Sequence, residues 1–164
     1  RTYKSDTDQR QYRRGLYTHW QRTFLHPMLA NFDAPGREEC LAQRSVSNTP
    51  QQALTLLNDP SFVEAARVAA QQLLQEQSDQ DFENRLQVFF TKALARSPST
   101  REVESLSPFF ADRLEHYRSN PEDAFAFTSI GLSKTPENLD RAELAAWTAL
   151  TRVIFNLNES IVRY

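Results

Sequence analysis

The feature that most constrains the fold is a series of helix-start signals spread along residues 49–164. In the stretch Thr49-Pro50-Gln51-Gln52, the threonine can cap a helix, the proline suits its first turn, and the glutamine stands three positions after the cap. The same kind of signal recurs at three later places, which are Asp59 before a proline, Ser99 with Glu102, and Asp140. We predict a chain that repeatedly ends one helix and begins another.

The segments between these signals carry apolar residues at helical spacing. Phe62 to Leu74, Phe82 to Leu94 and Leu144 to Phe155 each repeat large apolar or alanine side chains every three or four residues. The sequence therefore predicts an all-α protein, an irregular helical bundle of about five to seven helices. At Pro108 we expect the helix to kink or to restart, with Ser107 as the new cap.

The first 48 residues show weaker helical periodicity and a different charge. Residues 1–22 carry a local charge of +4, so the rest of the chain carries −6. We predict a largely non-helical, basic N-terminal third over residues 1–48, an aromatic-rich arm and loop that packs on the helical bundle of residues 49–164. The two parts are expected to form one domain.

Composition excludes several classes of protein. A chain of 164 residues with one cysteine can form neither an internal disulfide nor a cysteine-based zinc site. Its three histidines stand in no pair with metal-ligand spacing, and no run of about 20 apolar residues could cross a bilayer. The net charge of −2 disfavours a general nucleic-acid binder. We predict no metal site, no nucleic-acid binding and no transmembrane segment.

Six stretches of the sequence resemble the motifs of one family, and they occur in the family's order. They are residues 12–23, 32–40, 48–60, 62–67, 145–148 and 156–159. Together they resemble the C-terminal domain of unknown function of large exported planctomycete-type proteins that also carry a planctomycete cytochrome-c-like domain. The last motif departs from the family at Asn158, where the pattern has aspartate, and at Ser160, where an aromatic residue is usual.

The resemblance implies an exported parent protein, at the periplasm or the cell surface, whose haem c lies outside this segment. It supplies no cofactor for this segment and no catalytic residue. The partners it implies are the upstream domains of the same protein or other exported proteins. Our first hypothesis is therefore a non-catalytic scaffold or interaction domain, in which Asp33, Arg37, Asn48 and Gln52 hold the irregular third in place.

The alternative is part of an extracellular carbohydrate-active hydrolase or oxidoreductase whose site is shared with a missing upstream domain. Its candidate polar cluster combines His19 and Arg37 with the carboxylates of Asp33 and Glu38. Carboxylates and a histidine that converge in one cleft could supply acid and base catalysis. The alternative thus predicts that these four side chains meet.

Overall fold

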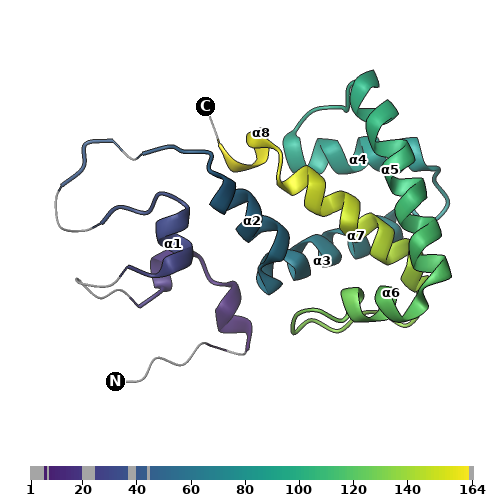
Figure 1. The fold of residues 1–164 in the computed structure, drawn as a ribbon, viewed down its shortest axis with the longest axis horizontal. Coiled ribbons are helices and arrows are strands. Elements are labelled where there is room, and N and C mark those ends of the chain that lie inside the picture. The colour runs from purple at the N-terminus through teal and green to yellow at the C-terminus, as the bar shows by residue number, and fades with distance from the viewer. Residues whose placement is uncertain (1–5, 7, 20–24, 37–39, 44, 163–164) are drawn as a thin grey trace. The chain divides into compact units, whose positions relative to one another are not determined.

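A computed structural model describes residues 6, 8–19, 25–36, 40–43 and 45–162 of the chain (Figure 1). These residues form eight α-helices and two short 3-10 helices, with no β-strand among them. The predicted all-α fold is confirmed. Within the same residues, no helix combines the length and the apolar character needed to cross a membrane.

The chain divides into two compact units, residues 1–52 and residues 53–164. The first unit contains the 3-10 helices Gln9–Tyr12 and Gly15–Tyr17, the helix α1 (Pro27–Asn31) and the start of α2 (Pro50–Asn58). All three elements before α2 are five residues or shorter. Among the described residues of this unit, no apolar side chain is buried.

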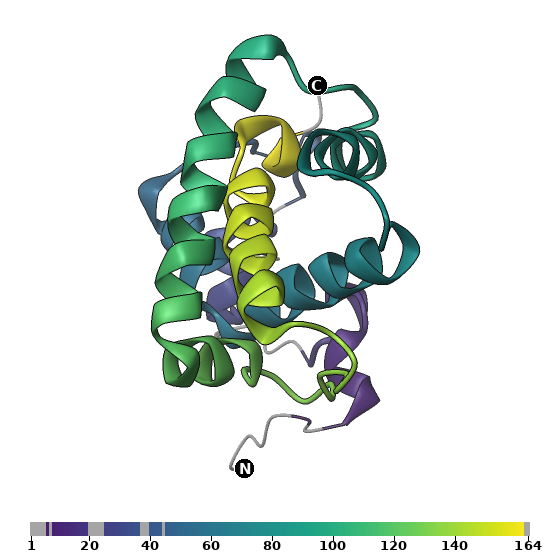
Figure 2. The same cartoon turned by 90° about the vertical axis from the view of Figure 1, so that its right-hand side faces the viewer.

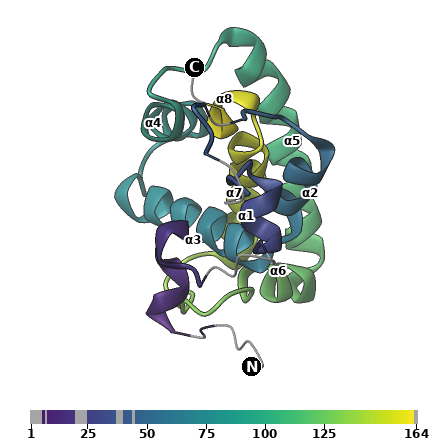
Figure 3. The ribbon, with the colours of Figure 1, turned by 90° about the vertical axis from the view of Figure 1, so that its left-hand side faces the viewer.

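The second unit is a bundle built around one central helix, α7 (Arg141–Phe155). Figure 2 shows α7 lying between α3 (Pro60–Glu76) and α5 (Thr100–Ser119), and these two helices make its largest contacts. The short helix α6 (Pro121–Thr128) also packs on α7. In Figure 3 the last helix, α8 (Asn158–Ile161), lies beside α4 (Phe82–Leu94).

The composition of α7 explains its central position. The run from Leu144 to Leu150 contains alanine, leucine, tryptophan and threonine, and every residue of it is buried. A helix that is apolar on all sides has to be surrounded by other elements. The rings of Phe82 and Phe110 lie 5.5 Å and 5.0 Å from the ring of Trp147. Leucine and phenylalanine side chains from α3 and α4 complete the same core.

The helices of the second unit begin with side chains that bind their free N–H groups. Asp59 accepts from the backbone N–H of Ser61 at 2.9 Å, and Asp140 accepts from that of Ala142 at 2.8 Å. At the start of α5, the Ser99 hydroxyl accepts from the Glu102 N–H while the Glu102 carboxylate accepts from the Ser99 N–H. Such caps fix where each helix starts because the first N–H groups of a helix have no partner within it.

The sequence predicted either a kink or a restart at Pro108, and the restart is wrong. The helix α5 does not restart at Ser107, and it continues through Pro108 as a single element from Thr100 to Ser119. Proline removes one hydrogen bond of the helix and leaves the carbonyl four residues earlier without a partner. Both Pro108 and Glu104, which carries that carbonyl, lie on the exposed face of α5, where water can bind the free oxygen.

Candidate functional site

The first unit contains a hydrogen-bond network centred on Asp33. The Asp33 carboxylate accepts from the Ser47 backbone N–H at 2.7 Å and from the Ser47 hydroxyl at 2.8 Å. The Gln52 amide donates to the Ser47 hydroxyl at 3.0 Å and to Asp33 at 3.5 Å. Asp33 itself has φ +57, a left-handed conformation that aspartate tolerates better than most residues. The network ties the turn after α1 to the residues that lead into α2.

The start of α2 belongs to the same network. The Thr49 hydroxyl accepts from the Gln52 N–H at 3.2 Å, and the Gln52 side-chain oxygen accepts from the Thr49 N–H at 2.9 Å. The Gln52 amide therefore completes a capping box with its oxygen and binds Ser47 with its nitrogen. Sequence reasoning missed Ser47, since a serine two residues before a helix cap carries no signal of a distant partner.

The four residues of the predicted polar cluster have different outcomes. Arg37 and Glu38 lie outside the described residues. His19 is exposed and makes no hydrogen bond or ion pair with Asp33 among the described residues. The Asp33 carboxylate is occupied by Ser47 and Gln52. Among the described residues, Asp33 thus accepts hydrogen bonds that hold the backbone at Ser47, and the convergence of the four side chains stays a prediction.

The second unit contains a buried ion pair that sequence reasoning also missed. Glu64 and Arg67 lie on α3 with relative exposures of 2% and 0%, and their charged atoms approach to 3.8 Å. Glu64 accepts from the backbone N–H groups of Leu132 at 3.0 Å and Ser133 at 2.5 Å. Arg67 donates to the Ser133 carbonyl at 2.8 Å. The pair therefore binds two backbone N–H groups and one backbone carbonyl of the loop between α6 and α7.

Gly131 leaves room for the Glu64 carboxylate to lie against the loop. It has φ +100, and a Cβ at its position would lie 2.3 Å from the Glu64 carboxylate carbon. A side chain there would both strain the backbone and displace Glu64. A sequence signal for this site did exist, because Glu64 and Arg67 interrupt the apolar face formed by Val63, Ala66 and Ala70 at helical spacing.

Arg85 likewise binds backbone groups of a second connection, the turn between α3 and α4. Its guanidinium donates to the carbonyls of Gln77 at 2.8 Å and Ser78 at 2.7 Å, in the turn between α3 and α4. It also forms an ion pair with Glu143 of α7 at 2.6 Å. One side chain thus connects this turn to the central helix.

Arg152 ties the end of α2. It donates to the carbonyl of Leu57, one of the last carbonyls of that helix, and lies over the ring of Phe127 at 5.2 Å. The Phe127 ring stacks on Tyr117 at 5.8 Å. Burial lowers the pKa of Arg152, but an arginine remains charged at neutral pH. Burial also raises the pKa of Tyr117, which keeps this phenol neutral.

Arg96 contacts side chains of three helices of the second unit, α4, α5 and α8. It pairs with Glu102 of α5 at 2.6 Å and with Glu159 of α8, and it lies over the Phe90 ring of α4 at 5.2 Å. Hydrogen bonds from Arg96 lower the pKa of Glu102 to about 2 and also lower that of Glu159. Glu159, the residue after Asn158, thus supplies a carboxylate that binds the Arg96 guanidinium.

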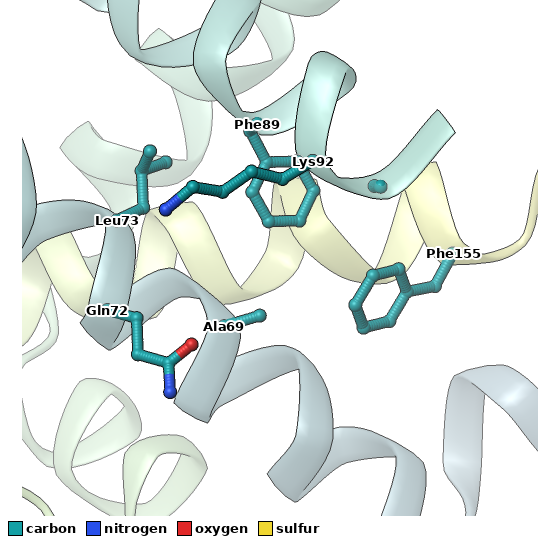
Figure 4. A pocket seen from close by; sticks show the side chains of 7 residues that line it. Ala69, Gln72, Leu73, Phe89, Lys92 and Phe155 are labelled. Atoms are coloured by element: carbon teal, nitrogen blue, oxygen red, sulfur yellow. The ribbon is translucent and has the colours of Figure 1, made fainter. Parts of the chain in front are cut away.

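The second unit also carries an apolar groove of about 230 Å³ between α3, α4 and α7. Figure 4 shows the rings of Phe89 and Phe155, whose centres are 6.0 Å apart, facing Ala69 and Leu73 of α3. Lys92 extends from α4 toward α3, where it pairs with Glu76. The groove offers contact area for apolar groups, and its one charged lining residue, Lys92, is paired with Glu76.

No group of three histidine, cysteine or acidic side chains among the described residues is arranged to hold a metal ion. Comparison with protein families gives a match that covers about two thirds of the chain. Residues 1–110 match the family described as PSD1, protein of unknown function (DUF1553). No curated protein and no solved structure matches the chain.

Proposed function

The chain belongs to the PSD1 family of proteins of unknown function (DUF1553), and from this premise we propose that it is a non-catalytic scaffold and interaction domain of a larger exported protein. One observation carries the proposal. In the second unit, the most deeply buried charged side chains form hydrogen bonds with backbone groups of loops or helix ends. Glu64, Arg67 and Arg85 are examples. Buried charges used in this way fix the shape of a molecule.

The loop that the ion pair of Glu64 and Arg67 holds is next to exposed apolar side chains. Leu132 of the loop is 52% exposed, and Phe125 of α6 is 59% exposed. The guanidinium of Arg141 lies over the Phe125 ring at 5.1 Å and donates to the Thr128 hydroxyl at 3.0 Å. Exposed leucine and phenylalanine on fixed backbone, with an arginine beside them, have the composition of a protein interface. Fixed backbone also lowers the entropy cost of binding.

The proposed partner of this surface is an upstream domain of the same exported protein. In this proposal the haem c of the parent is bound by its cytochrome-c-like domain, and the present segment holds no cofactor. A visible absorption spectrum tests the assignment of the haem. We expect the bands of a c-type haem in the full-length parent and none in the 164-residue chain. Haem bands in the isolated chain would contradict the assignment.

Limited trypsin digestion tests the proposed interface, because Lys134 is an exposed cleavage site two residues after Leu132. In the isolated chain we expect cleavage after Lys134, and in the full-length parent we expect this cleavage to be at least about tenfold slower. The substitution Phe125→Asp in the parent should restore fast cleavage by weakening the docking.

The matched control is Ala111→Asp, which adds the same charge at an exposed position of α5. It should leave the slow cleavage of the parent unchanged. Equal cleavage rates in the isolated chain and the wild-type parent would contradict the proposed interface, and so would equal effects of the two substitutions.

A further inference from the structure

A shallow depression of about 550 Å³ lies where the turn between α3 and α4 meets one side of α4. Four of its lining side chains are amides, namely Gln77 and Gln80 of the turn and Asn84 and Gln87 of α4. Thr91 and Val88 continue the lining along the helix. The positions 84, 87, 88 and 91 are three or four residues apart and share one face of α4. The amides therefore surround a single concave surface.

The amide groups of this depression are available for a ligand. The side chains of Gln77, Gln80, Asn84 and Gln87 form no hydrogen bond with any described residue. Each amide offers two N–H donors and one acceptor oxygen in a fixed plane. The one charged side chain in the lining, Lys92, pairs with Glu76. The depression thus presents many donors and acceptors and little net charge.

The backbone that carries these amides is held in place. Arg85 binds the carbonyls of Gln77 and Ser78 and pairs with Glu143 of α7. Asp81 caps α4 by accepting from the Asn84 N–H at 2.9 Å. A ligand would therefore have to order the amide side chains but not the turn, which lowers the cost of binding.

From this geometry we infer that the depression binds a neutral polyhydroxylated ligand, a saccharide. Each sugar hydroxyl both donates and accepts, so neighbouring hydroxyls can bond to the N–H and the oxygen of one amide. The neutral lining does not favour an ionic ligand. A peptide gains most of its affinity from apolar side chains that enter pockets, and Val88 is the one apolar residue of the lining. Binding to exposed amides should be weak, with a Kd on the order of 1 mM.

An NMR titration of the whole 164-residue chain tests the inference. The probes are cellohexaose and maltohexaose, with a neutral glycine- and serine-rich hexapeptide as the comparison. We expect saturable shifts of the side-chain amide signals of Asn84 and Gln87 with at least one of the two saccharides. The peptide should leave these signals in place.

The double substitution Asn84→Ala and Gln87→Ala should weaken saccharide binding by at least about tenfold, read from the shifts of backbone signals around the turn. The control Gln75→Ala removes an exposed amide of α3 outside the depression and should leave binding unchanged. The inference is overturned if neither saccharide shifts the signals, if the double variant binds as well as the wild type, or if the peptide alone produces the shifts. None of these results bears on the interface proposed at Phe125 and Leu132.

Discussion

The two units of the chain differ in the interactions that stabilise each of them internally. In residues 53–164, apolar side chains from α3, α4 and α7 form a core, and charged side chains bind the connections between the helices. In the described part of residues 1–52, no apolar side chain is buried, and the Asp33 carboxylate joins segments through hydrogen bonds to Ser47 and Gln52. Apolar periodicity encodes the second unit, whereas individual polar contacts organise the first.

The largest expected effect comes from breaking the buried ion pair of the second unit. Arg67→Ala removes the guanidinium that pairs with the buried Glu64 carboxylate, and we expect a loss of about 3–5 kcal/mol in the free energy of unfolding. Equilibrium urea denaturation measures this loss. The double variant Glu64→Leu and Arg67→Leu removes both charges and should be less destabilised than the single variant. A loss below about 1 kcal/mol for Arg67→Ala would show that the pair does not hold the loop.

The next largest effect should arise in the first unit at Asp33. Asp33→Ala leaves the Ser47 N–H and hydroxyl without their acceptor, and we expect the first unit to lose about 2 kcal/mol. Hydrogen exchange at the Ser47 amide reports this locally and should become faster, while exchange in α7 stays unchanged. Asp6→Ala is the matched control, because Asp6 forms only an exposed ion pair with Arg10 among the described residues. Unchanged protection of Ser47 in Asp33→Ala would refute the polar network as the organising contact.

The contact of Arg96 with Glu102 should give stability that depends on pH. The pKa of Glu102 is lowered from 4.5 to about 2, so the charged form is favoured in the folded state. This contribution is present above pH 4.5 and disappears as the pH falls toward 2. Glu102→Gln should cost roughly 1–2 kcal/mol at pH 7, since both side chains are partly exposed.

Urea denaturation of Glu102→Gln and the wild type at pH 7 and at pH 2.5 checks this pH dependence. The difference in unfolding free energy between the two proteins should shrink at the lower pH. A difference that is equal at both values would exclude the ion pair as its source.

The smallest effect is expected at the cap of α2. Thr49→Ala removes the hydroxyl that accepts from the Gln52 N–H and should cost about 1 kcal/mol. Thr49→Ser keeps the hydroxyl and should stay close to the wild type. Urea denaturation compares the three proteins. If alanine and serine behave alike, the capping hydroxyl contributes nothing measurable.

The helices could be predicted because their signals are local. Asp140 and the apolar run after it determine where α7 starts and why it lies at the centre. At Pro108 the sequence left a kink and a restart open, because the exclusion of a restart depends on Glu104 and Pro108 facing solvent in the folded protein. Local sequence describes a helix well but not its surroundings.

The polar contacts were harder to predict because they join distant residues. Ser47 lies 14 positions from Asp33, and Glu64 lies 68 positions from Leu132. Glu64 and Arg67 could have been noticed as charges on an apolar face, but their loop partner depends on the positive φ of Gly131. The predicted cluster of His19, Asp33, Arg37 and Glu38 stays a prediction, because Arg37 and Glu38 lie outside the described residues, and the contact of Asp33 with Ser47 carried no local signal.

Hydrogen exchange at the backbone amides of Leu132 and Ser133 tests the central claim, that buried charges of the second unit fix its connections. Both residues are exposed, yet their N–H groups donate to the buried Glu64 carboxylate. We predict slow exchange at these two amides in the wild-type chain and fast exchange in Glu64→Ala, while the amides of α5 exchange alike in both proteins. Fast exchange at Leu132 and Ser133 in the wild-type chain would contradict the account.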